Sequence, residues 1–157
     1  MIADVRPHRY VSGKNPKRLP RSGVDEYGRS PLHLAVIDGD ARLVADLLAS
    51  GMHTDAQDDN GRTALHFAAD RSDTPIARLL LAHGAAVDIQ DANGNTALFN
   101  AVFSSRGVGE TILLLRQAGA DINLANRHGV SPLSLARTIA NFDVSRYFDD
   151  QSGANEA

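Results

Sequence analysis

Glycine residues recur along this chain at a nearly fixed interval. One series is spaced by 33, 33 and 35 residues, and each member is followed after three residues by Leu-x-x-Ala: Gly28, Gly61, Gly94 and Gly129. A second series is spaced by 33 and 35 residues: Gly51, Gly84 and Gly119. The two series keep one period and share one two-residue slip. A period of this length indicates stacked units that each bury an apolar face against a neighbour.

Three stretches carry the clearest version of the repeated motif. They are Ser30-Pro31-Leu32-His33-Leu34-Ala35, Thr63-Ala64-Leu65-His66-Phe67-Ala68 and Gly119-Ala120-Asp121-Ile122-Asn123. In these stretches the chain resembles the ankyrin repeat family. The resemblance implies an all-α fold, a solenoid of four stacked helix-turn-helix units with hairpin-like connecting loops. The expected repeats are 25–57, 58–90, 91–125 and 126–150, which make up an ankyrin repeat domain at 24–150.

Capping residues indicate where the helices begin. Ser30, Thr63 and Ser131 are placed as N-caps, and Pro31 stands at a first helical position, where proline is tolerated. The apolar residues of 41–49 recur at helical spacing, which predicts a second helix in the first repeat.

The third repeat is irregular. It gains two residues among Ser104, Ser105 and Arg106, and it has Phe99 where the first two repeats have histidine. Arg116 falls where those repeats have leucine. The insertion can be a binding feature, because arginine and aromatic residues often anchor interfaces. It can equally be a tolerated lengthening of a loop, which costs little free energy.

The fourth repeat has the pattern of a terminal unit. Val144, Tyr147 and Phe148 are expected to close the apolar side of a last helix, with Arg146 on its outer side. A polar outer face is what the last unit of a stacked array needs.

Charge divides the chain into a basic start and an acidic remainder. The net charge is −3, but residues 1–24 hold six Lys or Arg and one acidic residue, whereas the other 133 hold ten Arg and eighteen acidic residues. Residues 1–23 form a basic extension containing proline and glycine, and 151–157 form a polar tail. The extension can be an arm for an acidic surface or nucleic acid, or a cap or disordered segment.

Composition restricts the chemistry and the compartment. Cysteine is absent, so neither disulfides nor thiolate metal sites are possible. The start resembles no signal peptide, and no stretch has eighteen consecutive apolar residues, so we expect a cytoplasmic protein without a membrane span. The strong preference for arginine over lysine indicates a GC-rich bacterial gene.

No constellation of residues predicts an enzyme, a metal site or a cofactor. The six histidines include no pair three or four residues apart on one helix, and His33 and His66 are one repeat apart, about 8–10 Å, too far to share a zinc ion. Asp58 and Asp59 are expected to be solvated at a hairpin tip rather than to act as paired catalytic carboxylates. We therefore expect a non-enzyme that binds neither metal nor cofactor.

An array of this kind offers an extended face of hairpin tips and inner helices, which favours binding another protein. The acidic total charge favours a partner with a basic surface. Nucleic acid would be repelled outside the basic extension. The candidate binding residues are Glu26, Tyr27, Arg29, Asp38, Asp59, Asn60, Arg62, Asp70, Arg71, Asn93, Asn95, Phe103, Ser104, Arg106, Arg127 and His128.

The insertion carries a second resemblance. Its Val-Phe-x-Ser-Arg-Gly stretch, residues 102–107, is similar to an insertion in bacterial ankyrin proteins that are immunity partners of secreted toxins. The resemblance implies a cytoplasmic immunity protein that neutralises a toxin by covering its active surface. The alternatives are a general adaptor, a regulatory or effector ankyrin protein, or nucleic-acid binding through the basic extension.

Overall fold

The computed structural model describes residues 21–139 and 141–149. The polar tail expected at 151–157, and all but the last three residues of the basic extension expected at 1–23, lie outside the described residues.

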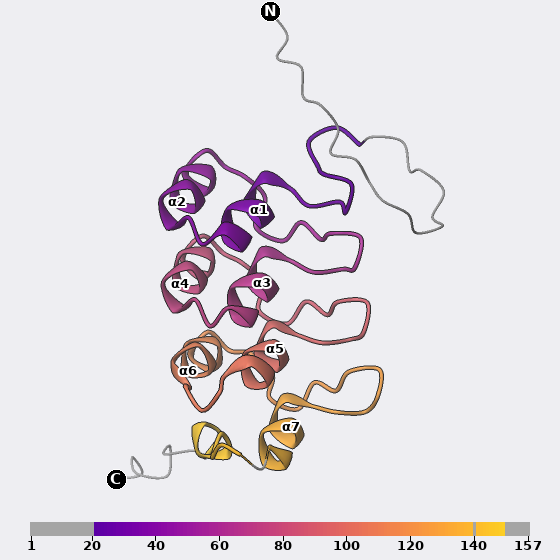
Figure 1. Cartoon of the computed structure of the whole chain (residues 1–157), viewed down its shortest axis with the longest axis vertical. Coiled ribbons are helices and arrows are strands. Elements are labelled where there is room, and N and C mark those ends of the chain that lie inside the picture. The colour runs from indigo at the N-terminus through magenta and orange to yellow at the C-terminus, as the bar shows by residue number, and fades with distance from the viewer. Residues whose placement is uncertain (1–20, 140, 150–157) are drawn as a thin grey trace, which may run out of the picture.

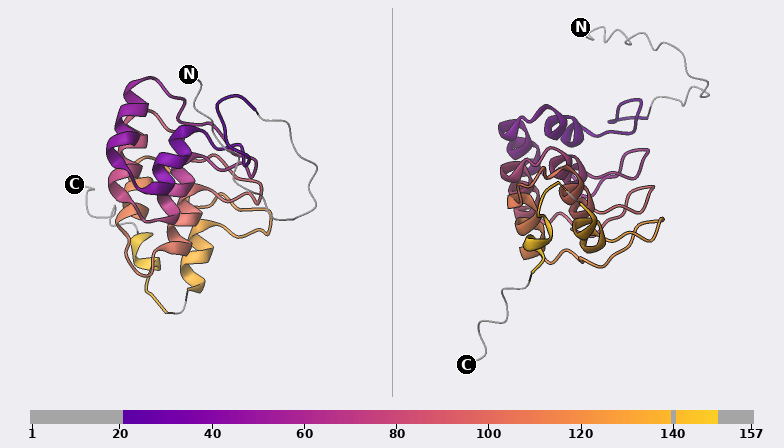
Figure 2. Two further views of the ribbon diagram at one scale, coloured as in Figure 1. Left: turned by 45° about the horizontal axis from the view of Figure 1, so that its top comes forward. Right: turned by 60° about the horizontal axis from the view of Figure 1, so that its bottom comes forward.

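The described helices form two parallel columns (Figure 1). The inner column contains α1 (Pro31–Asp38), α3 (Ala64–Asp70), α5 (Ala97–Ser104) and α7 (Pro132–Thr138). The outer column contains α2 (Ala41–Ala49), α4 (Thr74–Ala82) and α6 (Glu110–Gln117). The loops between repeats project beside the inner column and lie one above the other, which both views of Figure 2 show. The described residues contain no strand, as the all-α prediction requires.

Local sequence explains where these helices begin. Ser30 and Ser131 are N-caps whose side chains accept hydrogen bonds from the third helical residue, as predicted, and each is followed by proline. Asp40 caps α2 by accepting from the Leu43 N–H at 2.9 Å. Asp73 caps α4 in the same way. A cap of this kind satisfies one of the free N–H groups at a helix start.

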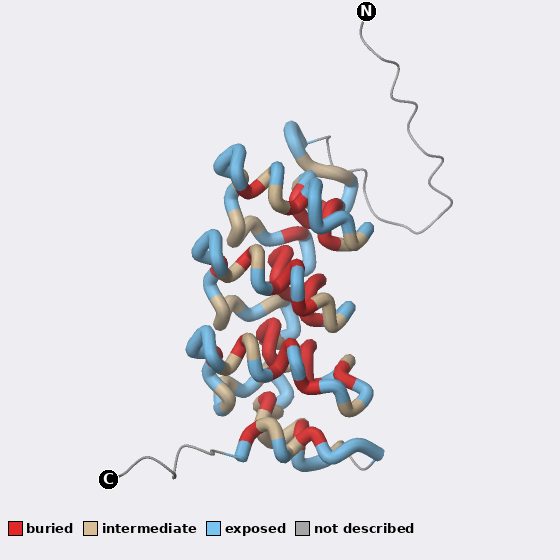
Figure 3. The backbone as a smooth tube through the Cα atoms, turned by 90° about the vertical axis from the view of Figure 1, so that its left-hand side faces the viewer, coloured by how far each residue is buried: buried red, intermediate tan, exposed pale blue. Residues whose placement is uncertain are grey.

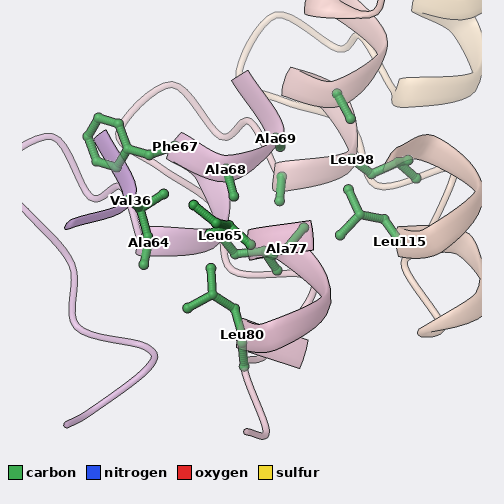
Figure 4. Close-up of a cluster of buried hydrophobic side chains, with 14 of the residues drawn as sticks. Val36, Ala64, Leu65, Phe67, Ala68, Ala69, Ala77, Leu80, Leu98 and Leu115 are labelled. Atoms are coloured by element: carbon green, nitrogen blue, oxygen red, sulfur yellow. The ribbon is translucent and has the colours of Figure 1, made fainter. Parts of the chain in front are cut away.

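The core runs as a continuous strip through the stack (Figure 3). Its centre is formed by leucines at equivalent positions of the inner helices, such as Leu65, which is 1% exposed. Figure 4 shows Leu65 beside Ala77 and Leu80 of the outer helix α4. Small alanines between the leucines let the thin helices pack closely, so each repeat buries its apolar face against the next.

The hairpin loops are built and joined by one repeated pattern. At the start of each hairpin one side-chain oxygen accepts two backbone N–H groups, two and four residues further on; these residues are Asp25, Asp58, Asp91 and Asn126. Neighbouring hairpins are then linked through the main chain. The N–H groups of Asp59, Ala92 and Arg127 donate to the carbonyl oxygens of Tyr27, Asn60 and Asn93, respectively.

Glycine is required in these hairpins for two reasons. Gly94 has a φ of 79°, and a Cβ atom there would lie 2.8 Å from the Arg127 backbone nitrogen of the next hairpin. Gly129 has a similar φ of 74°, but a Cβ there would meet nothing within 4 Å, because no further hairpin follows. The glycine series thus reflects both backbone conformation and the close stacking of loops.

The expected last helix is mostly absent. In place of an outer α-helix, the fourth repeat has a single 3-10 turn, Ser145–Tyr147. Val144 and Phe148 are buried as predicted. Two buried side chains, one helical turn apart, do not offset the unfavourable free energy of starting a longer helix. Arg116 of α6 donates a hydrogen bond to the carbonyl oxygen of Tyr147, which explains why an arginine replaces leucine there.

The insertion of the third repeat is tied to this last turn. The Tyr147 hydroxyl donates to the Gly107 carbonyl oxygen at 2.9 Å. The ring of Tyr147 lies directly against Gly109, where a Cβ would come within 2.3 Å of it. Ser105 is buried, and its hydroxyl donates to the Val102 carbonyl oxygen at 3.0 Å. Part of the insertion therefore supports the end of the stack.

Candidate protein-binding face

The hairpin tips and the adjoining sides of the inner helices form one side of the molecule, which we call the inner face. The candidate residues at the tips are exposed: Glu26, Tyr27, Asp59, Asn60, Asn93, Arg127 and His128. Near the C-terminal ends of the inner helices lie Asp38, Asp70, Arg71, Phe103, Ser104 and Arg106. Arg29, Arg62 and Asn95 are half-buried between these two groups. These placements are compatible with a single binding face; which of these residues contact a partner is a proposal.

Two half-buried arginines stack on aromatic rings at the upper part of the face. The Arg62 guanidinium lies 4.1 Å from the centre of the Phe67 ring, and that of Arg29 lies 5.6 Å from the same ring. Arg29 also lies 4.7 Å from the Tyr27 ring centre. Such cation–π contacts restrict the positions of the two arginine side chains.

The expectation that Asp58 is solvated is wrong. Asp58 is 6% exposed, because it lies at the base of its hairpin and its Oδ1 accepts the N–H groups of Asn60 and Arg62 at 2.9 and 2.8 Å. Its Oδ2 lies 4.0 Å from Arg29 Nε. The same position in the other repeats forms the same turn, so Asp58 is part of the scaffold. Asp59 is exposed at the tip, and Arg21 pairs with it.

The structure brings five of the candidates together around one polar pocket. Its volume is about 460 Å³, and it lies between the second and third hairpins and helices α3 and α5. Arg62 and Asp70 form an ion pair at this pocket. The other lining residues are Asn60, Asp91, Ala92, Asn93, Asn95 and Asn100.

Asn100 is a residue of this pocket that the sequence interpretation missed. It occupies the position held by Leu34, Phe67 and Leu135 in the other repeats. A polar residue at a position that is otherwise apolar is a signal that comparing the repeats would have found.

The insertion candidates lie at a separate place on the face. Phe103 is 73% exposed, and Arg106 is exposed with a φ of 46°. Both line an apolar pocket of about 300 Å³ together with Leu135, Ile139 and Phe142. Exposure of so large a ring is costly in water and marks an interaction site when it belongs to a larger apolar patch.

Two buried histidines join consecutive repeats. His33 Nδ1 accepts from the Ser30 N–H at 3.0 Å while its Nε2–H donates to the Arg62 carbonyl oxygen at 2.9 Å. His66 does the same with Thr63 and Asn95. Burial lowers the pKa of both histidines below the usual value, because the charged ring loses its hydration. Because Nδ1 of each ring accepts a main-chain N–H, both histidines are neutral and act as structural links between repeats.

The candidate set carries nearly balanced charge. It contains five arginines and four acidic residues, so the acidic excess of the chain lies elsewhere. The set itself therefore gives no preference for a basic partner surface.

The described residues offer neither a candidate metal site nor a membrane-spanning helix. Within 21–139 and 141–149, no group of three or more His, Cys, Asp or Glu side chains could hold a metal ion. Over the same residues, no helix is long and apolar enough to cross a membrane.

The paired columns of helices and the stacked hairpins define a repeat protein with one extended face. A family model for ankyrin repeats, in a form with three copies, matches residues 32–126. Because this match spans more than half of the sequence, the chain belongs to the ankyrin repeat family. A search of curated proteins found no match. Ankyrin repeats are typically non-catalytic domains that bind other proteins, and protein binding is the general role that follows.

Proposed function

We propose that this chain binds one protein partner along the inner face and acts by covering part of that partner's surface. The observation that carries the proposal is that different groups of atoms hold the hairpins and form their exposed tips. Main-chain groups and Asp or Asn side chains that are buried or half-buried hold the loops, while the tip side chains, such as Asn60 and Arg127, are exposed. A row of firmly held loops with exposed tip side chains is suited to recognition.

The specific form of the proposal is a cytoplasmic bacterial immunity protein that neutralises a secreted toxin. It rests on the similarity of residues 102–107 to the insertion of such proteins and on the exposure of Phe103. Arg106 stands beside Phe103 at the apolar pocket, so the two can act together as an anchor, one by buried area and one by hydrogen bonding. The same contacts would serve an adaptor or a regulatory protein.

The partner would meet a face of mixed charge. The acidic total of the chain favours a basic partner at long range, because net charge steers encounter. At short range the five arginines of the candidate set call for acceptors such as carboxylates or main-chain carbonyl groups. The salt dependence of the association rate would separate these two contributions.

In the first step of the test, the purified chain without a tag is used to capture binding proteins from a lysate of the source bacterium. The second step uses the purified partner. We expect calorimetry to give a defined one-to-one affinity that falls when Phe103 and Arg106 are replaced. If the partner is a toxin, co-expression of this chain should restore growth, and the replaced variant should restore it less. A partner that binds normally but is not toxic would exclude the immunity role and favour the adaptor. Unchanged affinity after replacing both residues would argue against the insertion as an anchor.

A further inference from the structure

The polar pocket between the second and third hairpins has an unusual lining. Four asparagines contribute to it, Asn60, Asn93, Asn95 and Asn100, and they come from two hairpins and from α5. The ion pair of Arg62 with Asp70 lies beside them. The pocket measures about 460 Å³, within the range of sites that hold a small ligand or a short peptide segment.

Asn100 is the residue that the fold does not explain. It is 7% exposed, it lines the pocket, and its carboxamide forms no hydrogen bond with any described residue. The equivalent residues Leu34, Phe67 and Leu135 show that this position of the repeat accepts apolar side chains. Neither amide atom of Asn100 is fully enclosed, so the carboxamide opens into the pocket, where a ligand can supply the hydrogen bonds that the protein does not.

Other groups at the pocket are already held in place. Asp91 Oδ1 accepts the N–H groups of Asn93 and Asn95, and Asn95 Oδ1 accepts from Asn126 Nδ2 at 2.8 Å. These bonds fix the Asn95 side chain with its oxygen occupied and its NH2 group left to donate. Prearranged donors and acceptors lower the entropic cost of binding.

The mixture of donors and acceptors selects the ligand. An anion would meet the carboxylates of Asp70 and Asp91, and a cation would meet the guanidinium of Arg62. A peptide amide offers one N–H donor and one C=O acceptor, and a side-chain amide offers two N–H donors and one C=O acceptor; a carboxamide such as that of Asn100 can pair with either. We propose that this pocket is a subsite for an amide group of the protein partner, either a peptide bond of an extended segment or the side chain of an Asn or Gln. The proposal rests on the proposed protein-binding role of the inner face.

The first experiment uses capped peptides as probes and the intact chain. Acetyl-triglycine-amide presents only main-chain amides, and acetyl-Gly-Asn-Gly-amide adds a side-chain amide; versions with Asp or Lys at the centre add a charge. We expect a neutral peptide to shift the side-chain NH2 signals of Asn100 and Asn60 in nitrogen-15 NMR spectra. Tighter binding of acetyl-triglycine-amide would identify a main-chain amide as the ligand, and tighter binding of acetyl-Gly-Asn-Gly-amide would identify a side-chain amide. Binding that is tighter for a charged peptide, or no shift with any peptide, would overturn the proposal.

The matched variants are Asn100→Leu, which copies Leu34 and Leu135, and Asn123→Leu, which alters an exposed asparagine outside the pocket. We expect Asn100→Leu to weaken peptide binding at least tenfold while the melting temperature stays the same or rises. Asn123→Leu should bind like the wild type. A fall in melting temperature for Asn100→Leu would assign Asn100 to the fold and overturn the proposal.

The native partner separates this proposal from the broader one. If Asn100→Leu binds the partner normally while Phe103→Ala/Arg106→Ala does not, the amide subsite is wrong and the inner face remains the binding surface. If neither variant affects the partner, the proposed role of the inner face fails as well. Loss of affinity in Asn100→Leu with unchanged stability supports both.

Discussion

His66 Nε2 lies 2.9 Å from the carbonyl oxygen of Asn95, so one neutral imidazole ties the second repeat to the loop of the third. Its Nδ1 accepts from the Thr63 N–H at 3.0 Å. Protonation would remove this acceptor. Since burial lowers the pKa of His66 in the folded state, folding disfavours the protonated form.

We therefore predict that stability falls as the pH drops below about 6.5, the ordinary histidine value. The unfolded chain binds the proton more readily in this window, and each buried histidine can remove at most about 1.4 kcal/mol per pH unit. The loss stops below the folded-state pKa. Urea unfolding at pH 7.5 and 5.5 measures it. His66→Phe, which copies Phe99, should flatten the pH dependence even if it lowers overall stability.

Leu65→Ala tests the core. Leu65 is 1% exposed in the middle of the stack, so removing its side chain should cost about 2–5 kcal/mol. The matched control is Leu43→Ala on α2, where leucine is 43% exposed and the expected loss is below about 1 kcal/mol. Urea denaturation gives both values. Equal losses for the two variants would show that the core is placed incorrectly.

Two glycine variants test the stacking of the hairpins. Gly94→Ala and Gly129→Ala both place a Cβ at positive φ, which costs about 1–2 kcal/mol. Only Gly94→Ala also crowds the Arg127 backbone, so it should cost a further 1–3 kcal/mol or so. The difference in melting temperature between the variants isolates the contact between loops. If the two melt together, the third and fourth hairpins do not touch in solution.

Phe103→Ala/Arg106→Ala tests the proposed anchor. Both side chains are exposed, and alanine keeps the backbone strain that Arg106 already has at φ 46°, so folding should change little. Affinity for the native partner should fall by about 2 kcal/mol or more, roughly 30-fold, if the two are hot spots. Calorimetry with melting curves as a check measures both.

Arg146 is not a suitable control position for this test. Arg146 is exposed, but it donates a 2.7 Å hydrogen bond to the Tyr147 hydroxyl, which in turn bonds Gly107 of the insertion. Arg78→Ala on the outer helix α4 is a cleaner choice. Wild-type affinity in the double variant together with a loss in Arg78→Ala would place the partner on the outer column instead.

Much of the fold was predictable because it depends on short-range chemistry that repeats. Serine caps and apolar spacing act within one unit, so the start of the first helix at Pro31 and the helix at 41–49 could be inferred without knowing their neighbours. The period then supplied the neighbours. The prediction of the last helix was wrong because helix formation there depends on having enough residues and a neighbouring surface to pack against, and no short sequence motif reports either.

The candidate site was less predictable because burial depends on how loops stack. Asp58 was expected to be solvated since it stands beside Asp59 in a polar stretch, yet its side chain is buried in the turn that it organises, beside Arg29 of the preceding repeat. Asn100 was overlooked because asparagine in a helix is unremarkable by itself. Its meaning appears only when the same position is compared in all four repeats.

The bonds between hairpins have a consequence for how this surface can change. Since the carbonyl groups of Tyr27, Asn60 and Asn93 receive the next loop through backbone atoms, the spacing of the tips does not depend on which side chains they carry. Mutation of the tip residues can therefore change which partner the hairpins bind while the scaffold keeps its shape. A library randomised at Glu26, Asn60, Asn93 and His128 should yield folded variants with new targets, and the same freedom would let natural selection follow a partner whose own surface drifts.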